Sequence, residues 1–302
     1  MFTVTYRKIF YMLTGIMLLI SIGSIAIFGL NVGVDFTGGS LLEVSYEGNV
    51  PDKAAIDSRL SGLSLGNLSL RQAGEKGFIL RTKTLTEEER VNILSTLSFG
   101  GQYQATQERL TTIGPTIGQE LRNKALVAIS VVIVMIVLYV AFVFRKVSEP
   151  VSSWKYGVIT IVSLLHDVVV PVGVVAILGQ FLGMQVDALF IMALLAILGY
   201  SVNDTIVVFD RVRENLRLNR DLNRKEDFEL TVGKSLEQTY GRSINTSFTT
   251  ALALLALFFL GPQATQDFAL IMLVGVIAGA YSSIFLASPL LVTINTWRGN
   301  RK

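Results

Sequence analysis

A carboxylate interrupts a long apolar run in the second half of the chain. Asn203 and Asp204 follow some twenty mostly apolar residues, and apolar residues return before the run ends at Asp210 and Arg211. In a helix, Asp204 would lie about 9 Å inside Asp210. Ionisable residues at membrane depth are rare and usually face a bundle interior or a water-filled cavity. The position therefore favours a functional role for Asp204 over a helix that ends early and leaves Asp204 wetted at the interface.

Two further polar positions stand inside or beside apolar runs. His166 and Asp167 lie about nine residues into one of them, where they either relay protons or form a packed polar pair that holds helices together. Arg242 stands at the start of another, at a depth that could match Asp204. An Asp–Arg pair that forms and breaks can load and unload a proton. The alternative is an Arg that marks the cytoplasmic boundary and extends to water.

The composition indicates a membrane protein without metal or thiol chemistry. Of 302 residues, 51% are hydrophobic and 16% charged, against about 25% charged in a soluble domain. No cysteine is present, and His166 is the one histidine. This excludes disulfides, zinc–thiolate sites and a His-rich metal site, and the lone histidine gives no support to an intramembrane hydrolase. We expect no enzyme activity and no cofactor, and the net charge of +3 does not indicate nucleic acid.

Six segments are apolar enough to cross a bilayer core, which takes about 20 residues each. The fifth is short, and the first is interpreted as a retained anchor because its apolar core is too long for a signal peptide. The six segments are 10–30, 125–144, 157–178, 188–209, 244–260 and 268–294.

The Lys and Arg residues of the short connections predict the orientation. Basic residues occur at both termini and in the second and fourth connections, and none occurs in 180–187 or 261–267. Both termini are therefore expected in the cytoplasm. The predicted organisation is an anchor at 1–30, an outer domain at 31–118, a five-helix segment at 119–297 with a cytoplasmic loop at 210–243, and a basic tail at 298–302.

The outer segment has the pattern of a small α+β domain. Residues 41–48, 67–74, 77–85 and 103–114 are typical of strands, and 51–63 and 86–99 of helices. Thr86 and Glu89 predict a capping box at the start of the second helix. The order βαββαβ predicts a ferredoxin-like sandwich. Without a catalytic cluster, a binding or mechanical role is expected.

Small and hydroxyl residues recur at 243–250 and 275–283. In membrane helices such residues allow close contact and interhelical hydrogen bonds. We interpret them as a packing signal without chemistry of their own.

Five stretches of the sequence carry a family pattern. They are VDFTGGS (34–40), GPTIGQELR (114–122), LLHDVVVPVG (164–173), GYSVNDTIVVFDRVREN (199–215), and the pair TSFTTALALLALFFLG (246–261) with GAYSSIFLASPLL (279–291). Together they resemble the SecD/SecF family of bacterial protein-export subunits, and within it the smaller SecF branch. They occur in the family's order and span nearly the whole chain.

The resemblance implies a six-helix bundle of the RND transporter superfamily in the bacterial inner membrane. It implies pairing with SecD, association with the SecYEG channel, and use of the proton-motive force to pull exported, unfolded polypeptide after SecA action. The proton path of the family falls on Asp204 and Arg242, beside Asn203, with H⁺ as the coupling ion. The family motifs, expected to be structural or coupling elements, fall on Asp35, Phe36, Gly38, Gly39, Gly114, Pro115 and Gly118.

Two other functions fit parts of the pattern. An RND-type exporter of small molecules or lipids usually has twelve helices and larger outer domains in one chain. A scaffold that stabilises the translocation channel without transducing energy would not need the carboxylate of Asp204.

Overall fold

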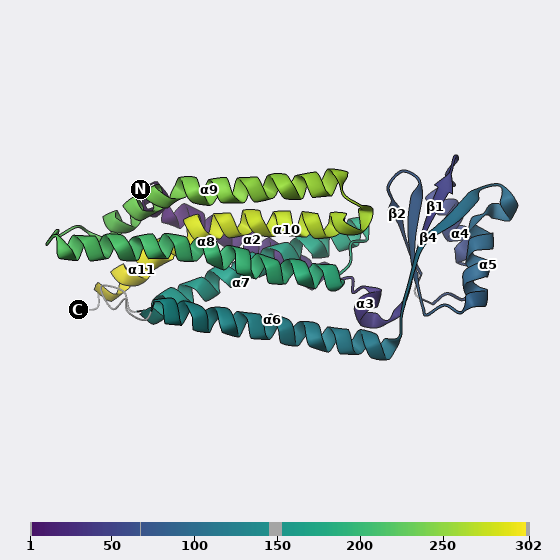
Figure 1. The fold of residues 1–302 in the computed structure, drawn as a ribbon, viewed down its shortest axis with the longest axis horizontal. Helices are drawn as coiled ribbons and strands as arrows, with labels where there is room; N and C mark the ends of the chain where they lie inside the picture. The colour runs from purple at the N-terminus through teal and green to yellow at the C-terminus, as the bar shows by residue number, and fades with distance from the viewer. Residues whose placement is uncertain (1, 67, 145–152, 300–302) are drawn as a thin grey trace. The chain divides into compact units, whose positions relative to one another are not determined.

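The computed structural model describes residues 2–66, 68–144 and 153–299. These form two compact units. The bundle unit comprises the described residues of 1–29, 128–177 and 189–302, and the sheet unit comprises 30–127 and 178–188. Figure 1 shows the elements of each unit.

Within the described residues, six helical spans are long and apolar enough to cross a membrane, which confirms the six predicted segments. A short helix, α1 (Phe2–Thr5), precedes them. Five spans are single helices, and the sixth consists of α10, a π-helical segment and α11. Their bounds are α2 Arg7–Phe28, α6 Pro115–Val143, α7 Ser153–Leu182, α8 Ala188–Asp221, α9 Phe228–Leu260, α10 Gln263–Ser282, the π-helical segment Ser283–Ala287, and α11 Ser288–Gly299.

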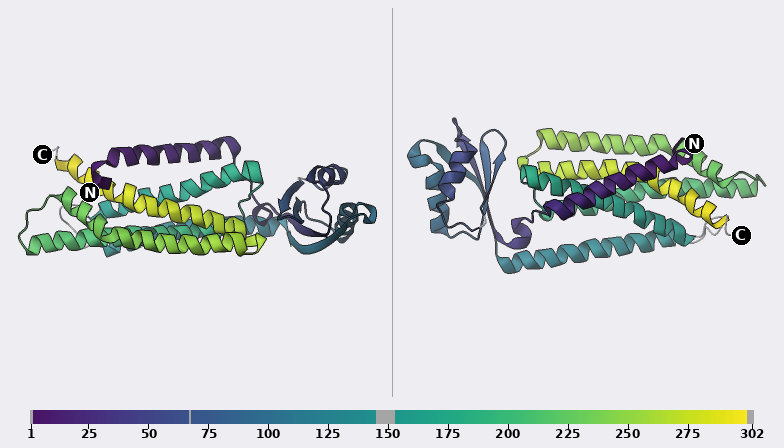
Figure 2. Two further views of the ribbon diagram at one scale, coloured as in Figure 1. Left: turned by 90° about the horizontal axis from the view of Figure 1, so that it is seen from above. Right: turned by 180° about the vertical axis from the view of Figure 1, so that it is seen from behind.

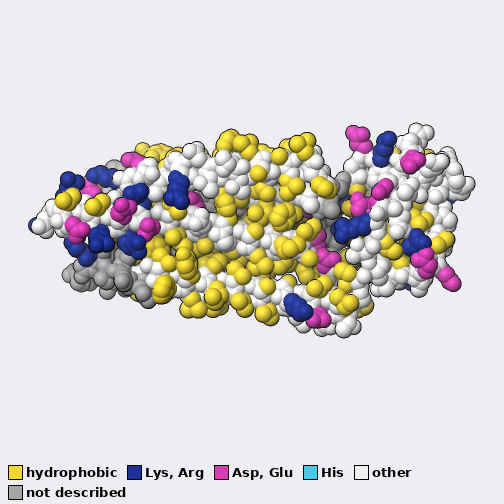
Figure 3. All heavy atoms as spheres, in the orientation of Figure 1, with side chains coloured by type: hydrophobic (Ala, Val, Ile, Leu, Met, Phe, Trp, Pro, Cys, Tyr) yellow, Lys and Arg dark blue, Asp and Glu magenta, His cyan; other side chains and the backbone are white. Residues whose placement is uncertain are grey.

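In the bundle unit, the start of α2, the turn between α8 and α9, and α11 lie at one end (Figure 2). Arg7 of α2 pairs with Glu229 of α9 at 2.9 Å at this end. Hydrophobic side chains dominate the visible face of the helices, while Lys, Arg, Asp and Glu gather where α8 meets α9 (Figure 3). This distribution suits a bundle whose middle contacts lipid and whose end contacts water.

The predicted loop at 210–243 is wrong in its length, because most of it is helical. Helix α8 runs on to Asp221 and α9 begins at Phe228. Charged residues alone do not end a helix, and here they form i,i+3 pairs such as Arg213–Asp210 at 2.6 Å. The two extensions also pack together. Asn215 donates hydrogen bonds to Ser235 and Gln238, and Val212, Leu216, Val232 and Leu236 contribute to an apolar contact between them.

The six spans are buried to very different extents. We compare the most apolar 18-residue stretch of each span. Half or more of that stretch is buried in α7, α8 and the last span, whereas only 6% of it is buried in α6 and 11% in α9. The core of the bundle unit forms around Phe144, Tyr156 and Phe209, with the Phe144 and Tyr156 rings stacked 5.1 Å apart. The inner faces of α7, α8 and the last span therefore position buried groups, and α6 and α9 present broad outer faces.

The sheet unit contains a four-stranded antiparallel sheet with the strand order β2-β3-β1-β4. Helices α4 and α5 cover one face of it (Figure 1). Alternating residues of β1, namely Leu42, Val44 and Tyr46, are buried in the core that both helices complete. The elements are β1 Gly39–Glu47, α4 Lys53–Leu60, β2 Ser69–Ala73, β3 Gly77–Thr82, α5 Glu87–Leu97, a 3₁₀ turn at Phe99–Gly101, and β4 Gln104–Ile113.

The start of α5 has the predicted capping box. The Thr86 hydroxyl accepts the Glu89 backbone N–H, and the Glu89 carboxylate accepts the Thr86 backbone N–H. Before the sheet, the residues of the Asp-Phe-Thr motif form a single helical turn, α3 (Val34–Thr37), which the sequence did not predict. Gly38 and Gly39 then take φ angles of 75° and 130° and lead into β1.

Candidate functional site

Asp204 lies on α8 and is half-buried in the bundle unit. Its Oδ1 accepts a hydrogen bond of 2.6 Å from the Ser243 hydroxyl of α9. Its Oδ2 is buried and accepts no hydrogen bond of normal length and angle from any described residue, although the Ser283 hydroxyl lies close to the carboxyl group. An ionised carboxylate has about four acceptor positions, so one oxygen of Asp204 keeps capacity for a proton or a water molecule.

Arg242 and Asn203 occupy different surroundings from Asp204. Both side chains are exposed in this single chain. Among the described residues, no ion pair joins Arg242 to Asp204, although the guanidinium is close enough to act on that carboxylate electrostatically. Neighbouring helical residues project about 100° apart, so when Ser243 faces α8, Arg242 faces outward. The structure thus brings Asp204 together with Ser243, and not into direct contact with Arg242.

Asp167 of α7 is fully buried and joins three helical spans. Its Oδ1 lies 2.8 Å from Nδ1 of the adjacent His166. Its Oδ2 accepts hydrogen bonds from the hydroxyls of Ser201 on α8 and Ser282 at the end of α10, the second at 2.7 Å. The His166 ring is also buried, and its Nε2 has no hydrogen-bond partner among the described residues. His166 and Asp167 are therefore brought together, and Asp167 is more completely bonded than Asp204.

Two hydroxyl groups that bond to each other lie beside the carboxylates of Asp167 and Asp204. Thr205, next to Asp204 on α8, shares a buried hydrogen bond of 2.8 Å with Ser283. Hydroxyls both donate and accept, so they can stabilise either protonation state of a carboxyl group. We call the set the polar cluster. It comprises His166, Asp167, Ser201, Asp204, Thr205, Ser243, Ser282 and Ser283.

Sequence reasoning missed the hydroxyl half of the polar cluster. The stretches 243–250 and 275–283 were interpreted as packing signals without chemistry, yet Ser243 and Ser282 bond directly to the two carboxylates. The serine content of those stretches was the available signal. Which of these serines bond to the carboxylates depends on which faces of α9 and α10 point into the bundle, and the sequence does not define those faces.

Two glycine motifs contact each other through their backbones in the sheet unit. The first glycine motif is residues 35–39, and the second is residues 114–118. A Cβ on Gly38 would lie 2.8 Å from Cα of Pro115, and one on Gly118 would lie 2.8 Å from the backbone N of Gly38 and 3.2 Å from the carbonyl carbon of Phe36. Gly39 is equally confined, because its Cβ would lie 2.5 Å from the Thr82 carbonyl oxygen. No heavy atom lies within 4 Å of such a position on Gly114.

Asp35 belongs to the sheet unit, whereas the polar cluster belongs to the bundle unit. The Asp35 Oδ2 accepts the backbone N–H of Ala188 at 2.9 Å, at the first residue of α8. The chain beside it is also paired: the Gly33 N–H bonds to the Val186 carbonyl, and the Val186 N–H to that of Asn31. Asp35 thus fixes the motif to the start of α8, as a structural residue would.

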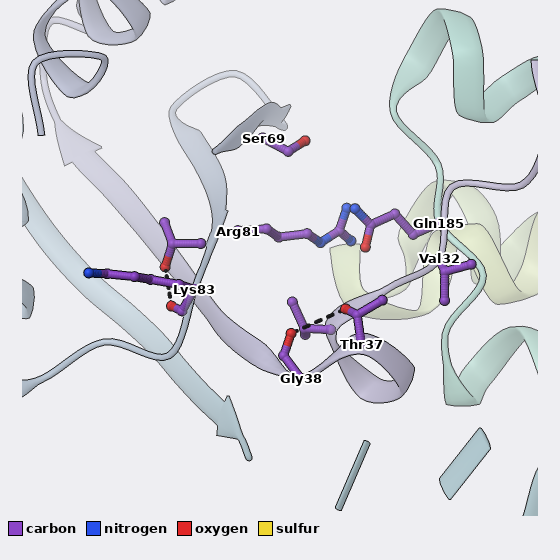
Figure 4. Close-up of a pocket in the computed structure, with 9 residues that line it drawn as sticks. Val32, Thr37, Gly38, Ser69, Arg81, Lys83 and Gln185 are labelled. Atoms are coloured by element: carbon purple, nitrogen blue, oxygen red, sulfur yellow. Dashed lines mark hydrogen bonds between the residues drawn. The ribbon is translucent and has the colours of Figure 1, made fainter. Parts of the chain in front are cut away.

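A cavity of about 330 Å³ adjoins the first glycine motif. Arg81 extends from β3 across this cavity toward Gln185, while Thr37 and Gly38 form its wall (Figure 4). No group of three or more His, Cys, Asp or Glu side chains suited to a metal ion occurs among the described residues.

Comparison with known families agrees with these motifs. The family described as "Protein export membrane protein SecD/SecF, C-terminal" matches residues 95–297, and "SecD/SecF GG Motif" matches residues 23–50. The chain belongs to the SecD/SecF family. The second match contains Gly38 and Gly39, and the first contains the whole polar cluster.

Individual members of the SecD/SecF family resemble the chain over nearly its full length. A relative from Thermobaculum terrenum, named protein translocase subunit SecF, is 39% identical, with 96% of this chain and 92% of the relative covered. The SecF subunit of Anaerolinea thermophila is 36% identical, with 95% and 91% covered. The crystal structure of SecDF from Thermus thermophilus, a translocon-associated membrane protein, superposes with a TM-score of 0.83 at 33% identity. It covers 98% of this chain and 38% of that one.

Proposed function

We propose that the chain is a SecF-type subunit of the bacterial protein-export machinery, which couples the proton-motive force to late translocation through SecYEG after SecA action. Its family membership and the names of its full-length relatives support the export role. The proton coupling is supported by one observation: Asp204 lies within a candidate membrane span, with one oxygen bonded to Ser243 and the other buried without a well-formed hydrogen bond to any described residue.

SecD is the proposed partner. The Thermus thermophilus relative named SecDF matches 91% of this chain over 35% of its own length, so a second, larger portion accompanies the SecF-like part there. The outer faces of α8 and α9 support such a partner, because they expose polar residues along candidate membrane spans, including Asn203, Arg242, Asn245 and Thr246. Polar groups facing lipid are costly, and a neighbouring subunit would cover them.

We propose that the sheet unit is a ferredoxin-like domain outside the cytoplasm. The strand order β2-β3-β1-β4, with one helix after β1 and another after β3, supports this fold. The domain, proposed at 31–118, follows the first candidate span, which ends at Phe28, and its last four residues lie in the second, which begins at Pro115. The concentration of Lys and Arg at the α8–α9 end of the bundle supports cytoplasmic termini in the inner membrane (Figure 3).

In the proposed mechanism, Asp204 gains and loses a proton through water that enters from either side of the membrane. Arg242, whose guanidinium acts on the carboxylate from the exposed side of α9, biases that exchange once SecD covers it. His166 and Asp167 form a second candidate proton site. One elementary charge that crosses 100 mV supplies about 2.3 kcal/mol. That amount biases a domain movement that holds or releases exported polypeptide, and it does not unfold a protein domain by itself.

The test replaces Asp204 in the complex with SecD and measures export of a precursor into vesicles with and without a proton gradient. Asp204→Asn is expected to leave assembly intact and to abolish the stimulation by the gradient. Asp210→Asn is the matched control, because Asp210 lies six residues further along α8, is exposed, and pairs with Arg213. Full stimulation in Asp204→Asn would refute proton coupling at this residue and would favour a scaffold role.

A further inference from the structure

The larger cavity of the sheet unit has a volume of about 540 Å³. It lies between α4 and β2 on one side and the turn that follows α7 on the other. Its residues are Asn31, Lys53, Ser69, Leu70, Arg71, Gln72 and 179–183. The volume falls in the range of small-ligand sites.

Both charged side chains of this lining are basic. Lys53 is exposed at the first residue of α4, and Arg71 is half-buried in β2. The Arg71 side chain runs past the turn, since a Cβ on Gly183 would lie 3.8 Å from its Cδ. Gly183 has a φ of 67°, which favours glycine at this turn. The lining therefore presents two cations, and no carboxylate belongs to it.

The same lining includes two exposed apolar side chains. Phe181 and Leu182 are 70% and 57% exposed and are the last residues of the α7 candidate span. The end of a span lies at the level of the lipid headgroups. A ligand complementary to this lining has an anionic headgroup that contacts the two cations and an apolar portion that contacts Phe181 and Leu182.

We propose that this cavity binds the phosphate headgroup of an anionic phospholipid through Arg71 and Lys53, with an acyl chain beside Phe181 and Leu182. The smaller neighbouring cavity, which shares Ser69, suits such a ligand less well (Figure 4). The described residues of its lining include no aromatic residue that could lie beside an acyl chain. The inference is independent of proton coupling at Asp204.

Lipid retention by the full chain tests the proposal. The purified protein in detergent is mixed with phosphatidylglycerol or with phosphatidylcholine of identical acyl chains, and bound lipid is counted by native mass spectrometry. Phosphatidylglycerol is expected to be retained preferentially. Arg71→Gln combined with Lys53→Gln is expected to weaken its binding about tenfold, because two phosphate contacts are lost. Arg71→Lys keeps the charge, so its binding of phosphatidylglycerol is expected to stay close to that of the unchanged chain and well above that of the double variant.

The control is Lys76→Gln, which removes an exposed cation from the β2–β3 turn of the same unit, outside the cavity. It is expected to bind phosphatidylglycerol as the unchanged chain does. If Arg71→Gln does not fold, Lys53→Gln alone still tests the site, with an expected loss of about threefold. Equal retention of the two lipids, or unchanged retention in the double variant, would overturn the proposal. Displacement of the lipid by equimolar inorganic phosphate would show that the cavity takes a free anion and would overturn it as well.

Discussion

The Ser243 hydroxyl on α9 donates a 2.6 Å hydrogen bond to Asp204 on α8, whereas Arg242, one residue earlier, faces away from that carboxylate. The direct partner of Asp204 within the chain is thus a neutral hydroxyl. A hydroxyl can follow a carboxyl group through protonation by rotating, without moving the helix. Arg242 is left at the outer face, where a second subunit can approach it.

Ser243→Ala is expected to lower the free energy of unfolding by about 1 kcal/mol, because one interhelical hydrogen bond is lost. Gradient-stimulated export should fall, since Asp204 loses the contact that fixes its rotamer. Chemical unfolding in detergent and vesicle export measure the two effects. Thr249→Ala is the control, because the Thr249 hydroxyl is exposed and bonds only within α9. Equal effects of both changes would contradict a specific role for Ser243.

Asp167→Ala is expected to lower the free energy of unfolding by about 2–4 kcal/mol, since it leaves the buried Ser201 hydroxyl without its acceptor and breaks the link from Ser282, which keeps only its bond to the Gly279 carbonyl of its own helix. Asp167→Asn keeps an acceptor oxygen and should lose less. Thermal unfolding of the purified chain compares the two variants. If Asp167→Ala were as stable as the unchanged chain, the hydrogen bonds to Asp167 would not be holding the three spans together.

Alanine substitutions at the two glycines of the second glycine motif, Gly114 and Gly118, are expected to reduce stability by very different amounts. Gly118→Ala places a Cβ 2.8 Å from the backbone N of Gly38 and should cost about 1–3 kcal/mol of stability, because neither backbone can yield easily. Gly114→Ala meets no atom within 4 Å and should stay within about 0.5 kcal/mol. Paired unfolding curves decide the matter, and similar losses at both positions would contradict the observed packing.

The capping box of α5 should respond to acid. The Lys83 ammonium, together with the Thr86 backbone N–H, holds the pKa of Glu89 below its usual value. A lowered pKa in the folded state means that the stabilisation is present above the unfolded pKa of about 4.3 and is lost as the pH falls through the lowered value. Glu89→Gln should therefore reduce amide protection at the start of α5 at neutral pH, and the difference from the unchanged chain should vanish in acid.

Hydrogen exchange of the full chain, corrected for intrinsic rates, measures this protection. Glu88→Gln provides the control, because Glu88 lies in the same helical turn and forms no ion pair with any described residue. A loss of protection in Glu89→Gln that persists at low pH would show that the carboxylate charge is not responsible.

The sequence was a good guide where structure depends on local pattern. Hydropathy located six spans, alternation located four strands, and the Thr86–Glu89 spacing located a cap. It failed for the end of α8 and the start of α9, where a Lys- and Arg-rich pattern hides an apolar stripe that includes Val212 and Val232. Charge content predicts exposure to water, and it does not predict the end of a helix.

For the candidate site, the sequence predicted Asp204 and the His166–Asp167 pair but not the serines that bond to the two carboxylates. The choice between Arg242 and Ser243 depends on the rotation of α9 about its axis, which no periodic pattern in this polar stretch defines. The same holds for Ser201 and Ser282, which meet Asp167 from helices 34 and 115 residues away in the chain.

The π-helical segment of the last span begins at Ser283, directly after Ser282. These two serines bind different neighbours, Ser282 to Asp167 of α7 and Ser283 to Thr205 of α8. The last span is therefore tied to α7 and to α8 by two consecutive residues, one hydrogen bond to each. A rotation of this span about its axis would break both hydrogen bonds together, so its packing against α7 cannot change by rotation without changing its packing against α8.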